Sequence, residues 1–423
     1  MVRVPKIRGW LGWALLLSAL IGQPLGATEN EVRIGVLYPL SGSSAAAGRA
    51  VLAAVRAAKD IADNRYQLDL PLARDKGLRN FGGARIKLIV ADHGGSPERG
   101  RIEAERLIVE EKVVALYGAY QSSVTEVASA VAERLQIPFV TGESSSPALH
   151  RRGFRWFFRT GPHDRHYTEM MFDFLADFQT ARGVQFKTVA ILHEDSAFGS
   201  GSAAVQDELA TQHGLKVLAK MAYRADADHL VAEVKLLKSL DPDVMFPTSY
   251  TSDALLFFKT AKGLKYRPRM LIAQNAGFMD PKFLREVGKD AEGIISRAPF
   301  ALDMVDRIPL IGDVNAIYKK HSGGADIFDP PIRSFFGALV LMDAINRAGS
   351  AEPEAIREAL RDTYIPANQI PMPWYSVRFN PNGQNSGAGV VLVQYQDGQY
   401  RTIYPYRHAS RQVLYPMPGW HDH

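Results

Sequence analysis

Residues 113–149 carry a pattern that limits the fold of the whole chain: two apolar runs with a helical stretch between them. The runs, 113–117 and 137–140, each stop at a glycine, and serines follow. These serines are Ser122 and Ser123 after the first run, and Ser144, Ser145 and Ser146 after the second. Strand, helix, strand is the unit of a parallel sheet, in which successive strands end at the same edge. We therefore expect both serine clusters at the carboxyl edge of one parallel sheet.

That edge is where open α/β sheets bind ligands, and a helix that begins there offers free N–H groups to an anion. Ser122 or Ser123 stands at such a helix start. Serine at a helix start is also a common N-cap with no further role. Two clusters at one edge favour the ligand site, and both interpretations stay open on the sequence alone.

The same alternation extends over most of the chain. Strands and helices alternate through residues 32–111 and again through 188–273, which predicts two doubly wound lobes. Residues 64–84 read as a long surface loop. Near the end, Asp397 and Gly398 predict a β-hairpin turn. Residues 407–423 show no periodicity, and we expect an irregular tail.

The first 27 residues have the pattern of an export signal: basic residues, a short apolar core and a small-residue end. We expect a cleaved signal and an exported, periplasmic protein, because the apolar core is too short to span a membrane. An uncleaved anchor is the alternative, since Leu25 is larger than the residue that a signal peptidase prefers there. The chain has no cysteine, hence no lipid-attachment cysteine and no disulfide. Without the three signal cations the formal charge falls from +5 to +2, so no basic surface for nucleic acid is expected.

Motifs for catalysis, cofactors and metals are missing. The chain has no H-E-x-x-H and no P-loop, and the histidines lack a paired metal spacing. The stretch after Gly142 lacks the closing glycine of a nucleophile elbow, although a hydrolase would pair Ser144 or Ser145 with His193. Phe198, Tyr250 and Asn275 each follow a predicted strand of the second half. Hydroxyls facing aromatic walls predict a small-molecule site, with no enzyme activity, cofactor or metal.

Seven stretches in order resemble the periplasmic leucine/isoleucine/valine-binding type of ABC-transporter solute receptors. They are LYPLSG (37–42), YGAYQSS (117–123), IPFVTGESSSPAL (137–149), RGFRWFFRTGP (152–162), AILHEDSAFGSG (190–201), PDVMFPTSYTSDA (242–254) and AEGIISRAPF (291–300). The resemblance implies two α/β lobes with doubly wound parallel sheets, joined by three crossovers that act as a hinge. The expected parts are a signal peptide (1–27), lobe 1 (28–160 and 300–366), lobe 2 (161–299 and 367–406) and the tail (407–423).

The resemblance also implies roles for the candidate residues. In such receptors hydroxyls at the positions of Ser122 and Ser145 hold an amino acid's carboxylate, and the carbonyl at the position of Glu143 holds its ammonium. Ser123 and Ser144 are further candidates beside them. The second lobe would add Phe198, Tyr250 and an acidic partner for the ammonium.

The chain departs from the family pattern at two positions. Asn275, or Gln274 next to it, stands in place of the acidic residue, and Ala47 stands in place of a tyrosine. An amide in place of a carboxylate removes a charge-assisted hydrogen bond of about 1.5–3 kcal/mol. The site therefore demands an ammonium less strongly, and the missing tyrosine is expected to widen the pocket.

The sequence predicts an extracytoplasmic, monomeric receptor that delivers a small ligand to an ABC permease. The expected ligand is an amino acid or related carboxylate with an apolar or aromatic body. Two other classes stay open: a sensing module that presents the same fold to a signalling receptor, and a serine hydrolase.

Overall fold

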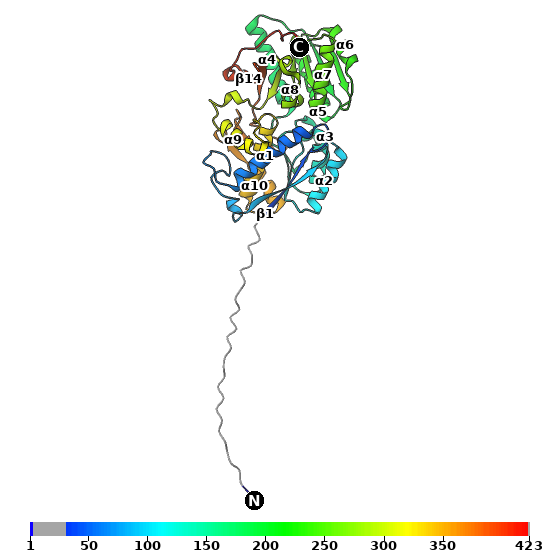
Figure 1. Ribbon diagram of the computed structural model, residues 1–423. Coiled ribbons are helices and arrows are strands. Elements are labelled where there is room, and N and C mark those ends of the chain that lie inside the picture. Colours follow the sequence, from blue (N-terminus) through cyan, green and yellow to red (C-terminus); the bar gives the residue numbers. More distant parts are fainter. Residues whose placement is uncertain (3–30, 422–423) are drawn as a thin grey trace.

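The computed structural model describes residues 1, 2 and 31–421 and folds into two lobes, one above the other (Figure 1). Apart from residues 1 and 2, the predicted signal peptide lies outside the described residues. The first lobe, lower in Figure 1, holds α1, α2, α3 and α10, and the second holds α4 to α8. No helix in the described part of the chain is long and apolar enough to cross a membrane. The predicted two-lobed α/β architecture is confirmed.

The first lobe is built on a five-stranded parallel sheet in the order β2-β1-β3-β4-β5. Its strands are β1 (Glu31–Tyr38), β2 (Arg85–Asp92), β3 (Ala115–Gly118), β4 (Phe139–Thr141) and β5 (Phe157–Arg159). The strand order reverses between β1 and β3, and ligands bind at such a switch point, outside the carboxyl ends of the strands. Both serine clusters lie at this edge, as the sequence predicted.

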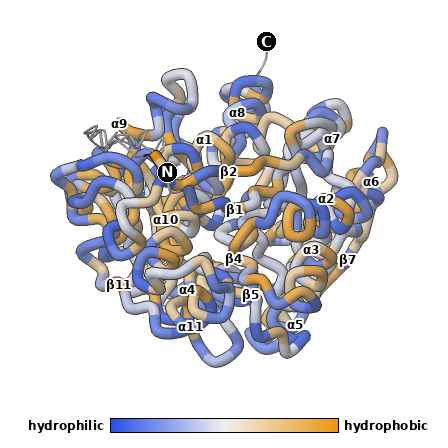
Figure 2. The backbone as a smooth tube through the Cα atoms, turned by 90° about the horizontal axis from the view of Figure 1, so that it is seen from below, coloured by the Kyte–Doolittle hydropathy of each residue, from blue (hydrophilic) through white to orange (hydrophobic). Residues whose placement is uncertain are grey.

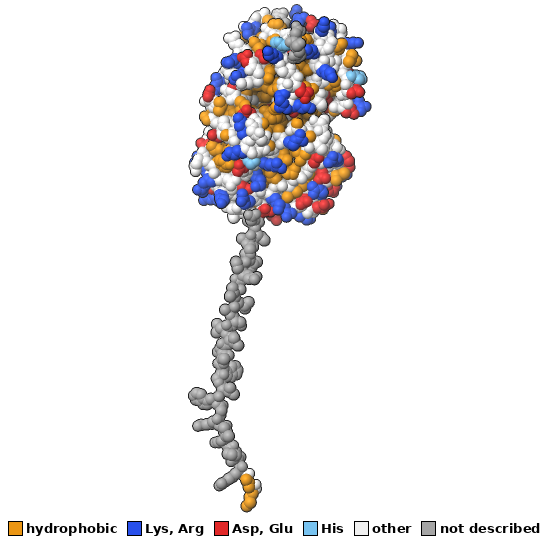
Figure 3. Space-filling view, viewed as in Figure 1, with side chains coloured by type: hydrophobic (Ala, Val, Ile, Leu, Met, Phe, Trp, Pro, Cys, Tyr) orange, Lys and Arg blue, Asp and Glu red, His pale blue; other side chains and the backbone are white. Residues whose placement is uncertain are grey.

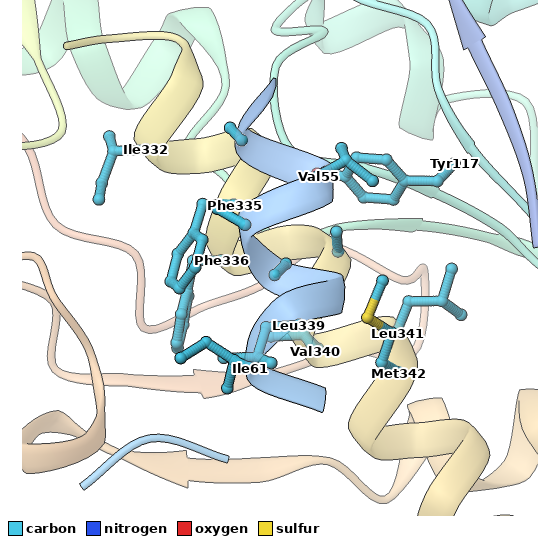
Figure 4. Close-up of a cluster of buried hydrophobic side chains, with 14 of the residues drawn as sticks. Val55, Ile61, Tyr117, Ile332, Phe335, Phe336, Leu339, Val340, Leu341 and Met342 are labelled. Atoms are coloured by element: carbon cyan, nitrogen blue, oxygen red, sulfur yellow. The ribbon is translucent and has the colours of Figure 1, made fainter. Parts of the chain in front are cut away.

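Helices cover both faces of this sheet. They are α1 (Ala45–Asp63), α2 (Pro97–Val109), α3 (Ser122–Leu135), α9 (Leu310–Ser322), α10 (Pro331–Ala348) and α11 (Pro353–Arg361). The core lies where α1 and α10 pack together, and Val55 and Ile61 of α1 belong to one buried cluster with Phe336 and Leu339 of α10 (Figure 4). Figure 2 shows hydrophobic and hydrophilic stretches alternating along α2, the pattern of a helix buried on one face.

The second lobe begins with a three-stranded parallel sheet, β7-β6-β8, and continues into a four-stranded mixed sheet, β9-β10-β13-β14. A single bridge between Met245 and Leu271 joins the two. The strands are β6 (Thr188–Glu194), β7 (Lys216–Tyr223), β8 (Val244–Thr248), β9 (Ile272–Ala273), β10 (Ile295–Ala298), β13 (Val391–Gln396) and β14 (Gln399–Tyr404). The β13–β14 hairpin turns at Asp397 and Gly398, both at positive φ, which confirms the predicted turn.

Five helices pack on these sheets: α4 (Asp164–Arg182), α5 (Ala197–Gln212), α6 (Val231–Leu240), α7 (Thr251–Gly263) and α8 (Pro281–Val287). Two clusters of buried side chains form the core of this lobe, one centred on Phe172, Phe174 and Phe178 and the other on Phe257 and Phe258. The lobe therefore has a core of its own, separate from that around α1 and α10.

Two of the chain crossings between the lobes are tied to each other. Arg159 donates from Nε to Gln384 Oε1 at 2.7 Å, and Gln384 donates to the carbonyl of Gly161 at 2.9 Å. Asn385 donates to the carbonyl of Thr160 at 2.9 Å. All of these residues are buried, so hydrogen bonds shielded from water hold the two crossings together.

The second of these two crossings, at Gln384 and Asn385, lies later in the chain than the expected boundary at residue 366. The short sheet of β11 (Tyr364–Pro366) and β12 (Ser376–Arg378) belongs to the first lobe, because Met372, Trp374 and Val377 lie in its core cluster. The chain returns to the second lobe only after Gln384 and Asn385. Prolines separate the apolar residues of this stretch, so it shows no helical or strand periodicity from which its burial could be predicted.

Two further expectations need correction. Residues 64–84 are not only a surface loop: Leu70, Leu72 and Leu78 are buried in the first core, and the N–H of Asn80 donates to Asn346 Oδ1 at 2.9 Å. The tail is irregular as predicted, but up to residue 421 it packs on the second lobe. Val413 and Met417 are buried there, and Arg267 lies 4.4 Å from the ring of Trp420.

His93 fixes the loop after β2 in a way that depends on pH. Its Nε2 lies 3.1 Å from the carbonyl of Ala119, and its Nδ1 accepts from the N–H of Gly95 at 3.1 Å. The ring therefore donates at Nε2 and accepts at Nδ1, which only neutral imidazole does. Burial lowers the pKa of His93 from 6.5 to about 4.

We predict that His93→Gln reduces the acid sensitivity of folding. Between pH 6.5 and 4 this histidine is protonated in the unfolded chain but stays neutral in the folded protein. The free energy of unfolding of the wild type therefore falls as the pH falls, by about 3 kcal/mol from this group. Denaturant unfolding at pH 7 and pH 4.5 should show a smaller loss in the variant. The exposed His229→Gln is the control, and equal losses in all three proteins would contradict the assignment.

Candidate ligand-binding site

The ligand crevice starts at two glycine turns of the first lobe. After β3, the chain turns through Gly118 into the N-terminus of α3, where Gln121 is the N-cap and its side chain caps nothing. After β4 it turns at Gly142, where a Cβ would lie 2.4 Å from the carbonyl oxygen of Arg333. Only glycine allows this approach of α10 to the sheet edge. Because no side chain caps α3, the N–H groups of its first turn are free at the crevice.

A small cavity closes between the lobes at this edge, with a volume of about 20 Å³. It is lined by Tyr120, Ser122, Glu143 and Ser145, by Phe198, Tyr250, Asn275, Ala276 and Arg297, and by Pro330 and Arg333. One water needs about 10–15 Å³, so the lobes are closed on each other and must part to admit a larger ligand. On the face shown in Figure 3, hydrophobic side chains gather around the waist between the lobes.

The structure brings most of the predicted site residues together. Ser122, Glu143 and Ser145 come from the first lobe, and Phe198, Tyr250 and Asn275 reach the same cavity from the second. In sequence these two groups are separated by the whole of β5 and α4. The carboxyl ends of strands in two sheets therefore converge, as expected of this edge.

Ser123, Ser144 and Ala47 do not line the cavity. Ser144 Oγ lies 2.6 Å from Thr125 Oγ1 and 3.2 Å from the carbonyl of Tyr120, so its role is to tie the two glycine turns together. Ser123 lines a separate, more open groove of about 610 Å³ at the mouth of the crevice. Ala47 is part of the α1 core, and the wider pocket expected from it is not found at this position.

Three aromatic rings form one wall across the lobe boundary. The ring of Tyr250 lies 5.9 Å from that of Tyr120 and 5.5 Å from that of Phe198, centroid to centroid. Burial raises the pKa values of both tyrosines above their ordinary range, so the phenols are neutral at physiological pH. Tyr120 was missed from the sequence. It takes φ +70°, which is uncommon for a bulky residue, and this turns it into the crevice.

The carboxylate of Glu143 is committed to the first lobe. The hydroxyl of Tyr38 donates to its Oε1 at 2.8 Å, and Thr141 Oγ1 lies 3.4 Å from Oε2. The main-chain carbonyl of Glu143 is also occupied, because Arg333 Nη1 donates to it at 2.7 Å and to the carbonyl of Gly142 at 3.1 Å. The resemblance assigned this carbonyl to a ligand ammonium, and here a guanidinium of the protein takes its place.

Asp329 joins the lobes beneath the cavity. Its Oδ1 accepts from Arg333 Nε at 2.5 Å within the first lobe, and its Oδ2 lies 3.3 Å from Arg297 Nη1 of the second lobe. The amide of Asn275 also donates to Oδ2. Arg297 lies 3.7 Å from the ring centroid of Tyr167 and 3.8 Å from Asp164 Oδ1. All of these side chains are buried.

Sequence reasoning missed Arg297, Asp329 and Arg333. Their ion pairs join β10 of the second lobe to the start of α10 in the first lobe. A contact between segments so far apart cannot be predicted from a local sequence pattern. A weak signal was present, since Arg297 stands inside the apolar run of β10 and Arg333 near the start of the apolar helix α10. A charged residue in such a run is rarely buried without a partner.

The groups that a hydrolase or a metal site would need have other arrangements. Ser144 is bonded to Thr125 and to Tyr120, while His193 Nδ1 lies 2.8 Å from the carbonyl of Glu194. Within the described residues, no group of three or more His, Asp or Glu side chains is placed to hold a metal ion.

Comparison with known proteins agrees with this geometry. The "Periplasmic binding protein" family profile matches residues 31–399. The Leu/Ile/Val-binding protein homolog 8 of Brucella suis is 27% identical over 413 residues, which cover 95% of this chain and 98% of that protein.

Solved structures share the fold at low identity. The leucine-binding protein LivK of Thermotoga maritima has a TM-score of 0.74 at 21% identity, covering 88% of this chain and 97% of its own. A solute-binding protein of an ABC transporter from Rhodopseudomonas palustris BisB5, in complex with 3,4-dihydroxybenzoic acid, has a TM-score of 0.73 at 18% identity, covering 92% and 99%. These relatives confirm the predicted resemblance to leucine/isoleucine/valine-binding proteins, and the profile over residues 31–399 establishes that the chain belongs to the periplasmic binding protein family.

Proposed function

We propose that this protein is the extracytoplasmic receptor of an ABC transporter and that it captures a small carboxylate with an apolar or aromatic body. The observation that carries the proposal is the cavity between the lobes. It combines the hydroxyls of Ser122 and Ser145 and the start of α3 with an aromatic wall from the other lobe. Hydroxyls and free N–H groups suit a carboxylate, and the rings suit an apolar body.

Closure of the lobes is the proposed mechanism. The ligand would bind first to the turns after β3 and β4, and the second lobe would then bring Phe198 and Tyr250 over it. The cavity of about 20 Å³ shows how little space the closed arrangement leaves, so the fit of the ligand body decides how far the lobes close. The closed shape is what a membrane permease would recognise.

The ligands named for two related proteins support this ligand class. One neighbour is named a leucine-binding protein, and another was crystallised with 3,4-dihydroxybenzoic acid. Both compounds carry a carboxylate and a mainly apolar body. The fold therefore accommodates amino acids and aromatic acids, and we propose that the ligand of this chain is a small carboxylate of this general kind.

A thermal-shift screen tests the proposal directly. We expect small aliphatic or aromatic carboxylates to raise the melting temperature, because a ligand at about 100 times its dissociation constant stabilises the folded state by roughly 2.7 kcal/mol. Sugars and cations of similar size serve as controls and should have no effect. A melting temperature that rises with the sugars or cations and with no carboxylate would contradict the proposed ligand class.

Ser145→Ala should weaken ligand binding without unfolding the protein. Ser145 Oγ faces the cavity and has no hydrogen bond to any other part of the described chain, so its loss leaves no protein group unpaired. The lost bond to a carboxylate is expected to cost about 1.5–3 kcal/mol, or roughly ten- to 100-fold in affinity by calorimetry.

The matched control for this variant is Ser239→Ala, at an exposed position on α6. It should keep wild-type affinity and melting temperature. If Ser145→Ala bound the ligand as tightly as Ser239→Ala, the placement of the carboxylate would be wrong.

A further inference from the structure

The guanidinium of Arg333 is bonded to the main-chain carbonyl to which the resemblance assigns the ammonium of an amino-acid ligand. Its Nη1 donates to the carbonyls of Gly142 and Glu143 at 3.1 and 2.7 Å. A carbonyl that already accepts from a guanidinium is a poor acceptor for a second cation. An ammonium placed there would also lie against the positive charge of Arg333, in a site where little water screens the repulsion.

Arg333 is held firmly in this place. Its Nε pairs with Asp329 Oδ1 at 2.5 Å, one helical turn earlier in the chain, and both side chains are buried. Burial lowers the pKa of Arg333, but the attractions of Asp329, Tyr167 and Glu143 together outweigh it, and the pKa lies above its ordinary value. The guanidinium therefore stays charged and cannot leave the carbonyls without separating a buried ion pair.

The charged side chains of the cavity wall favour an anion. Arg297 and Arg333 both line the cavity, whereas Asp329, which pairs with both, does not. The single carboxylate of the lining, Glu143, is turned to the hydroxyl of Tyr38. Arg297 Nε is a buried donor without an acceptor in the described part of the chain. A buried donor of a cation without a partner is costly, and a ligand carboxylate would satisfy it.

Asn275 offers the ligand one hydrogen-bond acceptor in the cavity. Asn275 Nδ2 donates to Asp329 and to the carbonyl of Arg297, which fixes the orientation of the amide. Its Oδ1 is left buried without a donor among the described residues. One neutral oxygen suits a single O–H of the ligand, but an ammonium brings three N–H donors and a charge.

We infer that the ligand is a carboxylate without an ammonium group, such as a 2-hydroxy acid or an unsubstituted acid, and that Arg333 determines this specificity. The inference rests on the proposed receptor function and sharpens it. The carboxylate meets the two guanidinium groups, the serines and the start of α3, and a hydroxyl, where present, donates to Asn275 Oδ1. The apolar body packs on Tyr120, Phe198 and Tyr250.

Calorimetry with matched ligand series tests the inference on the unmodified protein. One series is phenylalanine, 3-phenyllactate and 3-phenylpropanoate, and the other is leucine, 2-hydroxy-4-methylpentanoate and 4-methylpentanoate. Within each series only the group at the second carbon changes. We expect at least one series to show the ammonium-free acids bound at least tenfold more tightly than the amino acid.

The outcomes separate the inference from the proposed function. If the amino acids bind as tightly as their ammonium-free partners, or more tightly, the inference is overturned while a carboxylate receptor stands. If no compound of either series binds, and none in the wider carboxylate screen does, the proposed function is overturned together with the inference.

Variants at Arg333 test the assignment to this residue. Arg333→Met frees the carbonyls of Gly142 and Glu143, so the ratio of affinities should move at least tenfold towards the amino acid. Arg333→Lys keeps a cation there and should preserve the preference for ammonium-free acids. Because Arg333→Met leaves Asp329 without one partner, the double variant Asp329→Asn/Arg333→Met provides a second neutral form should the single variant fail to fold.

Arg361→Met, an exposed arginine on α11, is the matched control and should keep the wild-type ratio. An unchanged ratio in a folded Arg333→Met or double variant would overturn the role of Arg333.

Discussion

The buried carboxylate of Asp329 is the contact on which the closed arrangement of the two lobes depends. It accepts from Arg333 in its own lobe and from Arg297 and Asn275 in the other. In a dry interior such a group is tolerated only when its partners are in place, and loss of one partner typically costs about 3–5 kcal/mol. Parting of the lobes exposes these groups to water, which makes opening possible, and closing pairs them again. The lobes thus meet through this polar joint, the hydrogen bonds and ion pairs of Asp329, and water can take the place of these partners when the lobes part.

This joint also shapes the chemistry of the cavity above it. Arg333 reaches the carbonyls after β4 because Asp329 holds it at the start of α10, and Asn275 must be an amide because it donates to the same carboxylate. A carboxylate at position 275 would face Asp329 as a like charge. The exchange of an acidic residue for Asn275 is therefore coupled to the presence of Asp329 and Arg333. In the proposed receptor, selectivity and closure use the same few side chains.

Much of the fold and part of the site could be predicted from the sequence, for identifiable reasons. Ser122, Ser145, Phe198, Tyr250 and Asn275 follow strand ends, and parallel strands bring their carboxyl ends to one edge whatever their side chains. Ser144 follows the same rule, but its hydroxyl is turned to Thr125 and to the carbonyl of Tyr120, because the direction of a side chain within a turn depends on local backbone angles. Asp329 and the two arginines were not found, since their contacts join distant segments.

The sequence by itself determined the alternation of strands and helices, the two lobes, the edge that carries the site and the resemblance to solute receptors. Each of these follows from periodicity, glycine turns and short ordered motifs, which are local properties of the chain. Only the tertiary structure decided which side chains face the cavity and which charge fills the carbonyl of Glu143. It also assigned residues around Trp374 to the first lobe. Those features depend on contacts between segments far apart in the chain, and such contacts leave no periodic trace in it.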